Sequence, residues 1–181
     1  GKLNPLRCNA AIRRWLMALG VRLREGEAVR TITRDKGGFR IGTARGATLR
    51  AGTLVLATAA GTAALAGQLG VHIPARAEPL HMNITEATAP MIGHLVQHAD
   101  RMITLKQFST GQIVIGGGWP AALVGERGHP TVLLDSLLAN AALARQIAPR
   151  IAPLRIIRTW AGINTSVDGK GVLGPVHAVP G

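Results

Sequence analysis

Apolar residues recur every three or four positions in two stretches of the chain, which is the spacing of an amphipathic helix. The first stretch follows Asn4-Pro5, a pair that suits a helix start, and Gly20 marks its end. The second covers residues 131–147 and stops before Pro149. We expect two helices, the first packed on a sheet through its apolar face. Their apolar positions are Ile12, Trp15, Leu16 and Leu19, and then Val132, Leu133, Leu137, Leu138, Leu143 and Ile147.

Other stretches alternate apolar and polar residues, which is the period of half-buried strands. Turn residues separate them, at Lys36-Gly37-Gly38, at Arg45-Gly46 and at Gly111. This order predicts a small antiparallel meander early in the chain and a mostly antiparallel sheet later. The expected strands are residues 21–24, 28–33, 39–43 and 47–50 in the first group, and 80–85, 102–108, 112–116 and 154–160 in the second.

Residues 53–70 combine a strand, a tight turn and a helix start. Leu54-Val55-Leu56 suits a strand buried on both faces, and the small residues 57–61 follow it directly. Leu65 and Leu69 then share a helix face, and Gly70 stands where a C-cap is expected. Such a turn lets backbone approach a ligand closely, and amides at a helix start favour an anion or a polar edge. Close packing in an ordinary βα unit explains the same small residues equally well.

These elements predict an α/β fold of mixed α+β character. An α/β core with a meander insert comes first, and a largely antiparallel lobe with one main helix follows. Pro74 and Pro79 bracket the linker between them, and residues 161–175 are turn-rich, with little capacity for a core. We expect two lobes, one of residues 1–73 and 161–181, the other of residues 74–160.

Composition narrows the classes of function. The formal net charge of +12 over 181 residues suggests nucleic-acid binding as a function. However, the arginines form no dense run, and aromatic residues make up only 3%. We therefore expect no nucleic-acid partner. No apolar run reaches the roughly 18 residues needed to span a bilayer, and the start of the chain is not a signal peptide, so a cytoplasmic protein is expected. The single cysteine, Cys8, excludes an internal disulfide.

No set of residues predicts a metal site or a catalytic acid, base or nucleophile. Among six histidines only His94 and His98 have a close spacing, and the sequence around them is typical of a strand or loop. Gly116-Gly117-Gly118 resembles a phosphate loop in glycine content, but Trp119-Pro120 follows it where a phosphate loop has lysine and a hydroxyl residue.

Six segments in the correct order resemble the D-amino-acid oxidase family of FAD-dependent oxidoreductases, which includes glycine oxidase, sarcosine oxidase and subunits of opine oxidase and hydrogen cyanide synthase. The resemblance covers most of the chain. The segments are Asn4-Pro5-Leu6 with its helix; Gly20-Val21 and Glu25-Gly26 with residues 29–32; residues 53–61; Thr85-Glu86 after Pro74 and Pro79; Gln107 and Gly111 with Ile115-Gly116-Gly117; and Trp160-Ala161-Gly162 with Asp168-Gly169 and Leu173-Gly174.

The resemblance implies that residues 1–73 and 161–181 belong to a FAD-binding lobe and residues 74–160 to a substrate lobe, with the isoalloxazine ring between them. The implied cofactor-binding residues are Val29, Ala57, Ala59, Gly61, Gly162 and Gly174. The substrate-facing candidates are Gln107, Asn164 and His81. Alternatively, the side chains of Gln107 and Asn164 only form hydrogen bonds with backbone groups at strand ends, and His81 has a hydrogen-bonded structural role.

Departures from the family pattern affect which class of substrate is expected. Ala59 stands where a glycine is common, and Ile163-Asn164 stands where several members carry an arginine that pairs with the substrate carboxylate. The chain also has no tyrosine. An opine-like or proline-like secondary amine is therefore as plausible a substrate as a simple amino acid.

The sequence is thus interpreted as an internal piece of a FAD-dependent enzyme that oxidises an amine or amino acid by hydride transfer to flavin. We recognise no Gly-x-Gly-x-x-Gly loop that would seat the FAD pyrophosphate at a helix start, so we expect this piece alone to bind FAD weakly or not at all. A small-molecule substrate is the expected partner, and a homo- or hetero-oligomer is compatible with the family. The alternative is a non-catalytic binding or assembly module derived from such a subunit.

Overall fold

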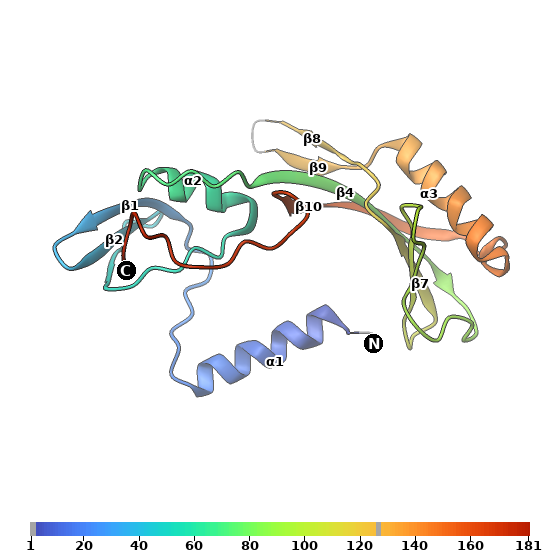
Figure 1. Cartoon of the computed structure of the whole chain (residues 1–181). Coiled ribbons are helices and arrows are strands. Elements are labelled where there is room, and N and C mark those ends of the chain that lie inside the picture. Colours follow the sequence, from blue (N-terminus) through green and yellow to red (C-terminus); the bar gives the residue numbers. More distant parts are fainter. Residues whose placement is uncertain (1–2, 126–127) are drawn as a thin grey trace. The chain divides into compact units, whose positions relative to one another are not determined.

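The computed structural model describes residues 3–125 and 128–181, and these fall into two compact units (Figure 1). Among the described residues, the meander unit consists of Pro5–Ala77 and Thr165–Gly181, and the sheet unit consists of Glu78–Asn164 with Leu3 and Asn4. The divisions lie four residues after those suggested by the sequence. The fold is mixed α/β with antiparallel sheets and three helices in the described part of the chain.

The meander unit is built on a three-stranded antiparallel sheet of β1 (Val29–Asp35), β2 (Gly38–Thr43) and β3 (Thr48–Ala51). A turn was predicted at Lys36-Gly37-Gly38. Asp35 pairs with Gly38, so the turn consists of Lys36-Gly37 alone, with Gly37 at φ 83°, and Gly38 begins β2. The apolar side of this sheet forms the core of the unit. That core consists of Ile32, Phe39 and Ile41, with Leu49, Leu54, Leu56, Leu65, Leu69 and Val179 packed against it.

Two predicted strands of the meander unit are absent. Residues 21–24 have no regular structure, and neither have residues 54–56, although Leu54 and Leu56 pack against the core. Val55 points away from it and is 81% exposed. A strand needs hydrogen-bonding neighbours in a sheet, and no other described strand pairs with either segment, so the apolar pattern alone did not suffice.

The helices of the meander unit are α1 (Pro5–Ala18) and α2 (Thr62–Gly67), the latter preceded by the 3-10 turn Ala59–Gly61. Gly70, at φ 74°, ends the segment as predicted, and the Val71 amide donates to the Ala66 carbonyl. The prediction that α1 packs on a sheet was wrong for this structure, because no residue of α1 is buried and Trp15 is 63% exposed.

The sheet unit holds a five-stranded sheet in the order β10-β4-β7-β6-β5. Its strands are β4 (Arg76–Ala87), β5 (Val96–Gln97), β6 (Thr104–Gln107), β7 (Gln112–Gly116) and β10 (Ile156–Ser166). A hairpin of β8 (Ala122–Val124) and β9 (His129–Thr131) leads to α3 (Leu134–Ile147), and the 3-10 turn Pro149–Ile151 follows. Because β10 continues to Ser166, residues 161–166 are strand, which corrects the turn-rich tail expected there.

Helix α3 covers one face of the five-stranded sheet. Its Ala144 shares a core with Ile103, Leu105, Ile113 and Ile115. The residues of α3 that are buried are Ser136, Asn140 and Ala144, four apart, so the buried stripe is small and polar. Of the larger apolar residues that the sequence predicted for this helix, Leu143 and Ile147 pack against the same core, whereas Leu133 and Leu138 are 39% and 57% exposed. Small side chains let the helix lie close to the sheet, which a stripe of leucines would not allow.

Candidate functional site

Strand alternation gives the five-stranded sheet two chemically different faces. The face that α3 covers, called here the covered face, carries the row Asn83, Ile115 and Leu105, which lie directly opposite one another on β4, β7 and β6. The next residues of the same strands form the row Ile84, Val114 and Lys106, which therefore points the other way. We call that side the opposite face.

Gln107 lies on the covered face, next to Ile113, and is 3% exposed. Its Oε1 accepts from two backbone amides and its Nε2 donates to three carbonyl oxygens, all in the loop and turn beside β6. The amides belong to Met91 (2.8 Å) and Ile92 (3.0 Å), and the carbonyls to Thr88 (3.3 Å), Ala89 (3.0 Å) and Gly111 (3.0 Å). These contacts favour the backbone role for Gln107 over contact with a substrate.

His81 also lies on the covered side of β4 and is fully buried. Its Nδ1 is 3.5 Å from the Thr159 hydroxyl, whereas its Nε2 and the Oδ1 of Asn83 have no hydrogen-bond partner among the described residues. The Asn83 amide donates to Asn140 Oδ1 (3.2 Å), and Asn140 donates to the Gly116 carbonyl (3.0 Å). Burial lowers the pKa of His81, and the Asn83 amide beside it acts in the other direction. Burial therefore favours the neutral form of the His81 ring.

Asn164 lies elsewhere, near the end of β10, and is exposed. Its Nδ2 donates to Oε2 of Glu78 at 3.0 Å, which links β10 to the start of β4. Glu78 is an even-numbered residue of β4, like Met82 and Ile84, so regular alternation puts it on the opposite face. The structure thus separates the three substrate-facing candidates, because His81 and Gln107 lie on the covered face and Asn164 beside Glu78 does not.

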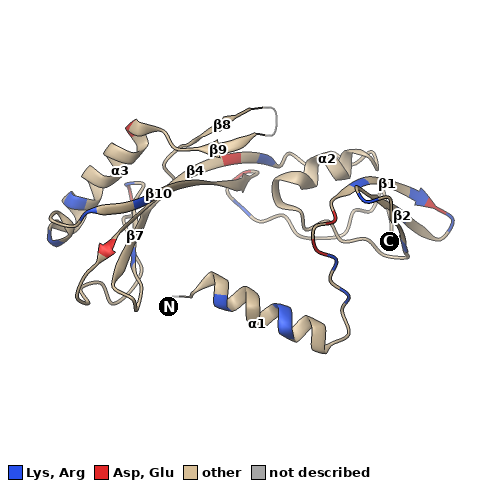
Figure 2. Ribbon diagram, turned by 180° about the vertical axis from the view of Figure 1, so that it is seen from behind, with Lys and Arg blue, Asp and Glu red and all other residues tan. Residues whose placement is uncertain are grey.

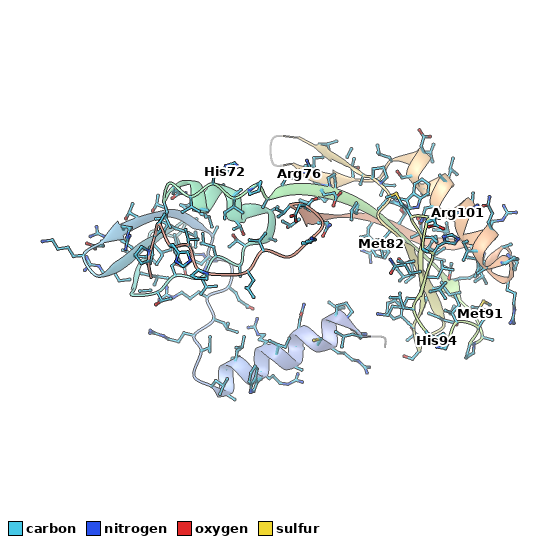
Figure 3. All side chains as sticks on the ribbon, viewed as in Figure 1. His72, Arg76, Met82, Met91, His94 and Arg101 are labelled. Carbon is cyan, nitrogen blue, oxygen red and sulfur yellow. The ribbon has the colours of Figure 1, made fainter. Side chains whose placement is uncertain are left out.

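The opposite face carries apolar side chains with a few polar ones among them. Met82, labelled in Figure 3, lies against Gly116 and Thr104, because a Cβ added at Gly116 would stand 2.6 Å from the Met82 sulfur and 3.2 Å from Thr104 Oγ1. The neighbouring row ends in Lys106. The sequence argument selected Gln107 on this strand, and the residue that faces this side is its neighbour Lys106. The sequence could have identified Lys106 from the alternation of β6. Leu105 and Ile113 are apolar and mark the buried face, and Lys106 follows Leu105 and therefore points the other way.

The predicted flavin-facing turn lies in the meander unit, where Ala57, Ala59 and Gly61 are all exposed. Ala59 adopts φ 50°, and it is the one non-glycine residue with positive φ among those described. This conformation costs an alanine on the order of 1 kcal/mol, which explains why glycine suits the position. No side chain caps the start of α2. The turn thus presents small side chains and exposed backbone.

The other predicted cofactor contacts are exposed backbone positions. Val29 begins β1 and is 37% exposed, and Gly174 lies in the meander unit at φ 154°. Gly162 lies on β10 of the sheet unit, and a Cβ there would meet no atom within 4 Å. Each leaves room for a ligand, and none supplies a charge for a pyrophosphate.

One stretch matches the spacing of a dinucleotide-binding loop letter for letter, and the sequence argument passed over it. Residues 169–174 read Gly-Lys-Gly-Val-Leu-Gly directly after β10. No helix follows in residues 175–181, so this stretch lacks the helix N-terminus on which such a loop holds a phosphate. The described residues of this stretch therefore provide no such seat for a pyrophosphate.

Comparison with known sequences assigns the family, because a profile described as FAD-dependent oxidoreductase matches residues 1–181. The chain belongs to this family. The cofactor of the family is FAD. The sarcosine oxidase subunit beta of Arthrobacter sp is 26% identical over 153 residues, which are 83% of this chain and 34% of that protein.

Solved structures agree on the fold. The glycine oxidase of Geobacillus kaustophilus superposes with a TM-score of 0.78 at 21% identity, over 93% of this chain and 44% of its own. The L-proline dehydrogenase of P. horikoshii superposes with a TM-score of 0.88 at 23% identity, over 98% of this chain and 48% of its own. The chain thus spans about a third of the curated relative and just under half of each of these structures.

Other features of the family member give no second site. Residues 97–104 with Gly117 and Gly118 line a pocket, in which His98 Nδ1 accepts from the Asp100 and Arg101 amides and Arg101 (Figure 3) donates to Gln146. In residues 3–125 and 128–181 no cluster of three or more metal-ligating side chains occurs. None of the helices found there is long and apolar enough to cross a bilayer. Lys and Arg are spread along both units (Figure 2).

Proposed function

We propose that this chain supplies part of a FAD-dependent oxidoreductase that oxidises the C–N bond of an amine or amino acid. The observation that carries the proposal is the match of the family profile to the whole chain. Two similar structures are named glycine oxidase and L-proline dehydrogenase, and a third is named iminodiacetate oxidase. These names support amino and imino acids as the substrate class.

The chain divides the work between its units. The turn of Ala57, Ala59 and Gly61 would hold the flavin, the backbone of Val29 would contact the adenine side, and Gly162 and Gly174 would lay backbone against the cofactor. The chemistry that FAD would supply is acceptance of a hydride from the carbon that carries the amine nitrogen. In the sheet unit, the apolar side chains of the opposite face would contact the substrate and exclude water from it. The imine product would be hydrolysed, and oxygen or another acceptor would take the electrons.

The test uses the whole protein encoded by the gene. The purified protein is examined for flavin absorbance and then mixed without oxygen with a panel of amines and amino acids. We expect bound flavin that is bleached by at least one amine or amino acid, with the imine trapped as its carbonyl product. Absence of flavin, or flavin that no member of the panel reduces, contradicts the proposal.

A non-catalytic assembly module is the second candidate. It is favoured by the name of the curated relative, a subunit, and by the apolar side chains that α1 exposes, among them Leu6 at 79% and Trp15 at 63%. The same preparation separates the two candidates. A protein that holds no FAD yet forms a stable oligomer in light scattering supports the module, whereas a flavin that substrate reduces supports the enzyme.

A further inference from the structure

Two buried polar atoms on the covered side of β4 have no hydrogen-bond partner among the described residues. They are Nε2 of His81 and Oδ1 of Asn83, and both side chains are fully buried. The two residues are two apart on the strand, so their side chains extend from the same face. Buried polar atoms are nearly always paired, because an unpaired one has given up its bonds to solvent without replacement. Both atoms therefore require a hydrogen-bonding partner.

A backbone carbonyl determines which atom of the Asn83 amide is left over. The carbonyl oxygen of Gly116 can only accept, so Asn140 turns its Nδ2 towards it, at 3.0 Å. The Oδ1 of Asn140 then accepts from Nδ2 of Asn83, at 3.2 Å. The orientation of both amides is thus fixed from the carbonyl end, and the atom of Asn83 that remains is the acceptor Oδ1.

A second backbone carbonyl determines where the proton of the His81 ring lies. The carbonyl oxygen of Met82 accepts from the Thr159 hydroxyl at 3.3 Å, and a hydroxyl has one hydrogen to donate. The same hydroxyl oxygen lies 3.5 Å from Nδ1 of His81. Because its hydrogen is already used, this oxygen accepts from the ring, so the proton of the neutral imidazole is on Nδ1. Nε2 then carries a lone pair and is an acceptor as well.

Two acceptors cannot form a hydrogen bond with each other. Nε2 of His81 and Oδ1 of Asn83 therefore need a small uncharged group that has two hydrogens to donate, and water is such a group. Buried waters in proteins typically make two to four hydrogen bonds to polar groups of this kind. A proton on Nε2 would be the alternative donor, but burial, the larger of the two influences on the pKa of His81, lowers that pKa and so opposes it.

We propose that one water molecule is bound between His81 and Asn83, donating one hydrogen to Nε2 of the ring and the other to Oδ1 of the amide. The water joins two branches of hydrogen bonds, so that β10 and α3 are both tied to β4. This inference concerns the sheet unit and does not depend on the proposed oxidation. In order, the protein groups of the two branches are the Met82 carbonyl, Thr159 and His81, and then Asn83, Asn140 and the Gly116 carbonyl.

A crystal structure of the whole protein encoded by the gene tests the water directly, without any substitution. We expect an ordered water about 2.7–3.2 Å from both His81 Nε2 and Asn83 Oδ1. A direct contact between these two atoms at that distance overturns the proposal. A map that shows ordered water elsewhere in the interior but none beside them overturns it too.

Nitrogen-15 NMR of the whole protein, labelled in its histidines, tests where the ring proton lies. Well above the ordinary pKa of histidine, we expect His81 to show a protonated Nδ1 and an unprotonated, hydrogen-bonded Nε2. The signals of His81 are those that disappear in His81→Gln, or in His81→Asn if the glutamine disturbs folding. A ring protonated on Nε2 overturns the proposal, because that nitrogen would then be a donor to Asn83.

A matched pair of threonine substitutions tests what sets the tautomer. Thr159→Val removes the acceptor of the Nδ1 proton with little change of shape, and Thr33→Val, at an exposed position of β1, is the control. We expect the proton to move to Nε2 in Thr159→Val, where it points to Asn83, and to stay on Nδ1 in Thr33→Val. Circular dichroism shows that the variants are folded, and Thr159→Ala is the second variant if valine disturbs packing. A proton that stays on Nδ1 in the folded Thr159 variant overturns the inference.

Discussion

The two faces of the five-stranded sheet use their polar residues in different ways. On the covered face, Gln107, His81 and Asn83 are buried. Gln107 binds backbone groups, Asn83 donates to Asn140 of α3, and His81 lies 3.5 Å from the Thr159 hydroxyl. On the opposite face Lys106 is half-buried, its Nζ donates to the Leu3 carbonyl, and its row neighbours Val114 and Ile84 are apolar. The difference teaches that polar residues on a buried face mainly serve folding, with His81 Nε2 and Asn83 Oδ1 as the atoms that have no partner among the described residues, whereas a polar residue on the other face is accessible.

Among the substitutions that test this comparison, Gln107→Leu is expected to lower the free energy of unfolding most. The change leaves two amides and three carbonyl oxygens around β6 without their partner. Each buried group left unpaired costs about 1–3 kcal/mol, and because some of these groups reach water we expect a loss of roughly 3 kcal/mol in the free energy of unfolding. Urea denaturation of the whole protein measures it.

Lys106→Met is the matched control for that measurement, because the two residues are neighbours on β6 and point to opposite faces. We expect it to change the free energy of unfolding by less than about 0.5 kcal/mol, as is usual for surface substitutions. Equal losses for the two variants would remove the distinction between the faces.

An intermediate effect is expected from two adjacent glycines. A Cβ at Gly117, which has φ 124°, would stand 2.4 Å from the Ile103 amide nitrogen, whereas a Cβ at Gly116 would meet the flexible Met82 side chain at 2.6 Å. Backbone cannot move aside as a methionine can, so Gly117→Ala should destabilise by about 2–3 kcal/mol and Gly116→Ala by about 1 kcal/mol. The order of the two denaturation midpoints checks this expectation, and the reverse order contradicts it.

The smallest expected effect is a dependence of the stability on pH that is caused by His81. Because burial lowers the pKa of His81 below 6.5, the unfolded chain takes up a proton more readily than the folded one. Stability should therefore fall as the pH drops through 6.5, and the fall should end once the pH passes the lowered pKa of the folded protein. His81→Gln should flatten this slope in urea denaturation between pH 7.5 and pH 5, while His72→Gln, at an exposed position, should leave it in place. An unchanged slope in His81→Gln would show that His81 is not the group responsible.

The sequence by itself determined the meander, the β6–β7 hairpin, α3 within a few residues of its start and the C-cap at Gly70, because these depend on local periodicity and on glycine in turns. Motif order also identified the family, which the profile match confirmed. The strand expected at residues 54–56 and the packing of α1 failed, since both require partners that periodicity does not supply.

Only the tertiary structure decided which residues share a face. In the sequence Gln107 and Lys106 are equivalent polar neighbours, and the choice between them rests on which side of β6 the helix α3 covers. The same holds for α3, whose buried stripe is Ser136, Asn140 and Ala144 because close approach to the sheet favours small side chains over leucine. A strand pattern gives the period of alternation, but the face that becomes buried is chosen by the element that packs on it.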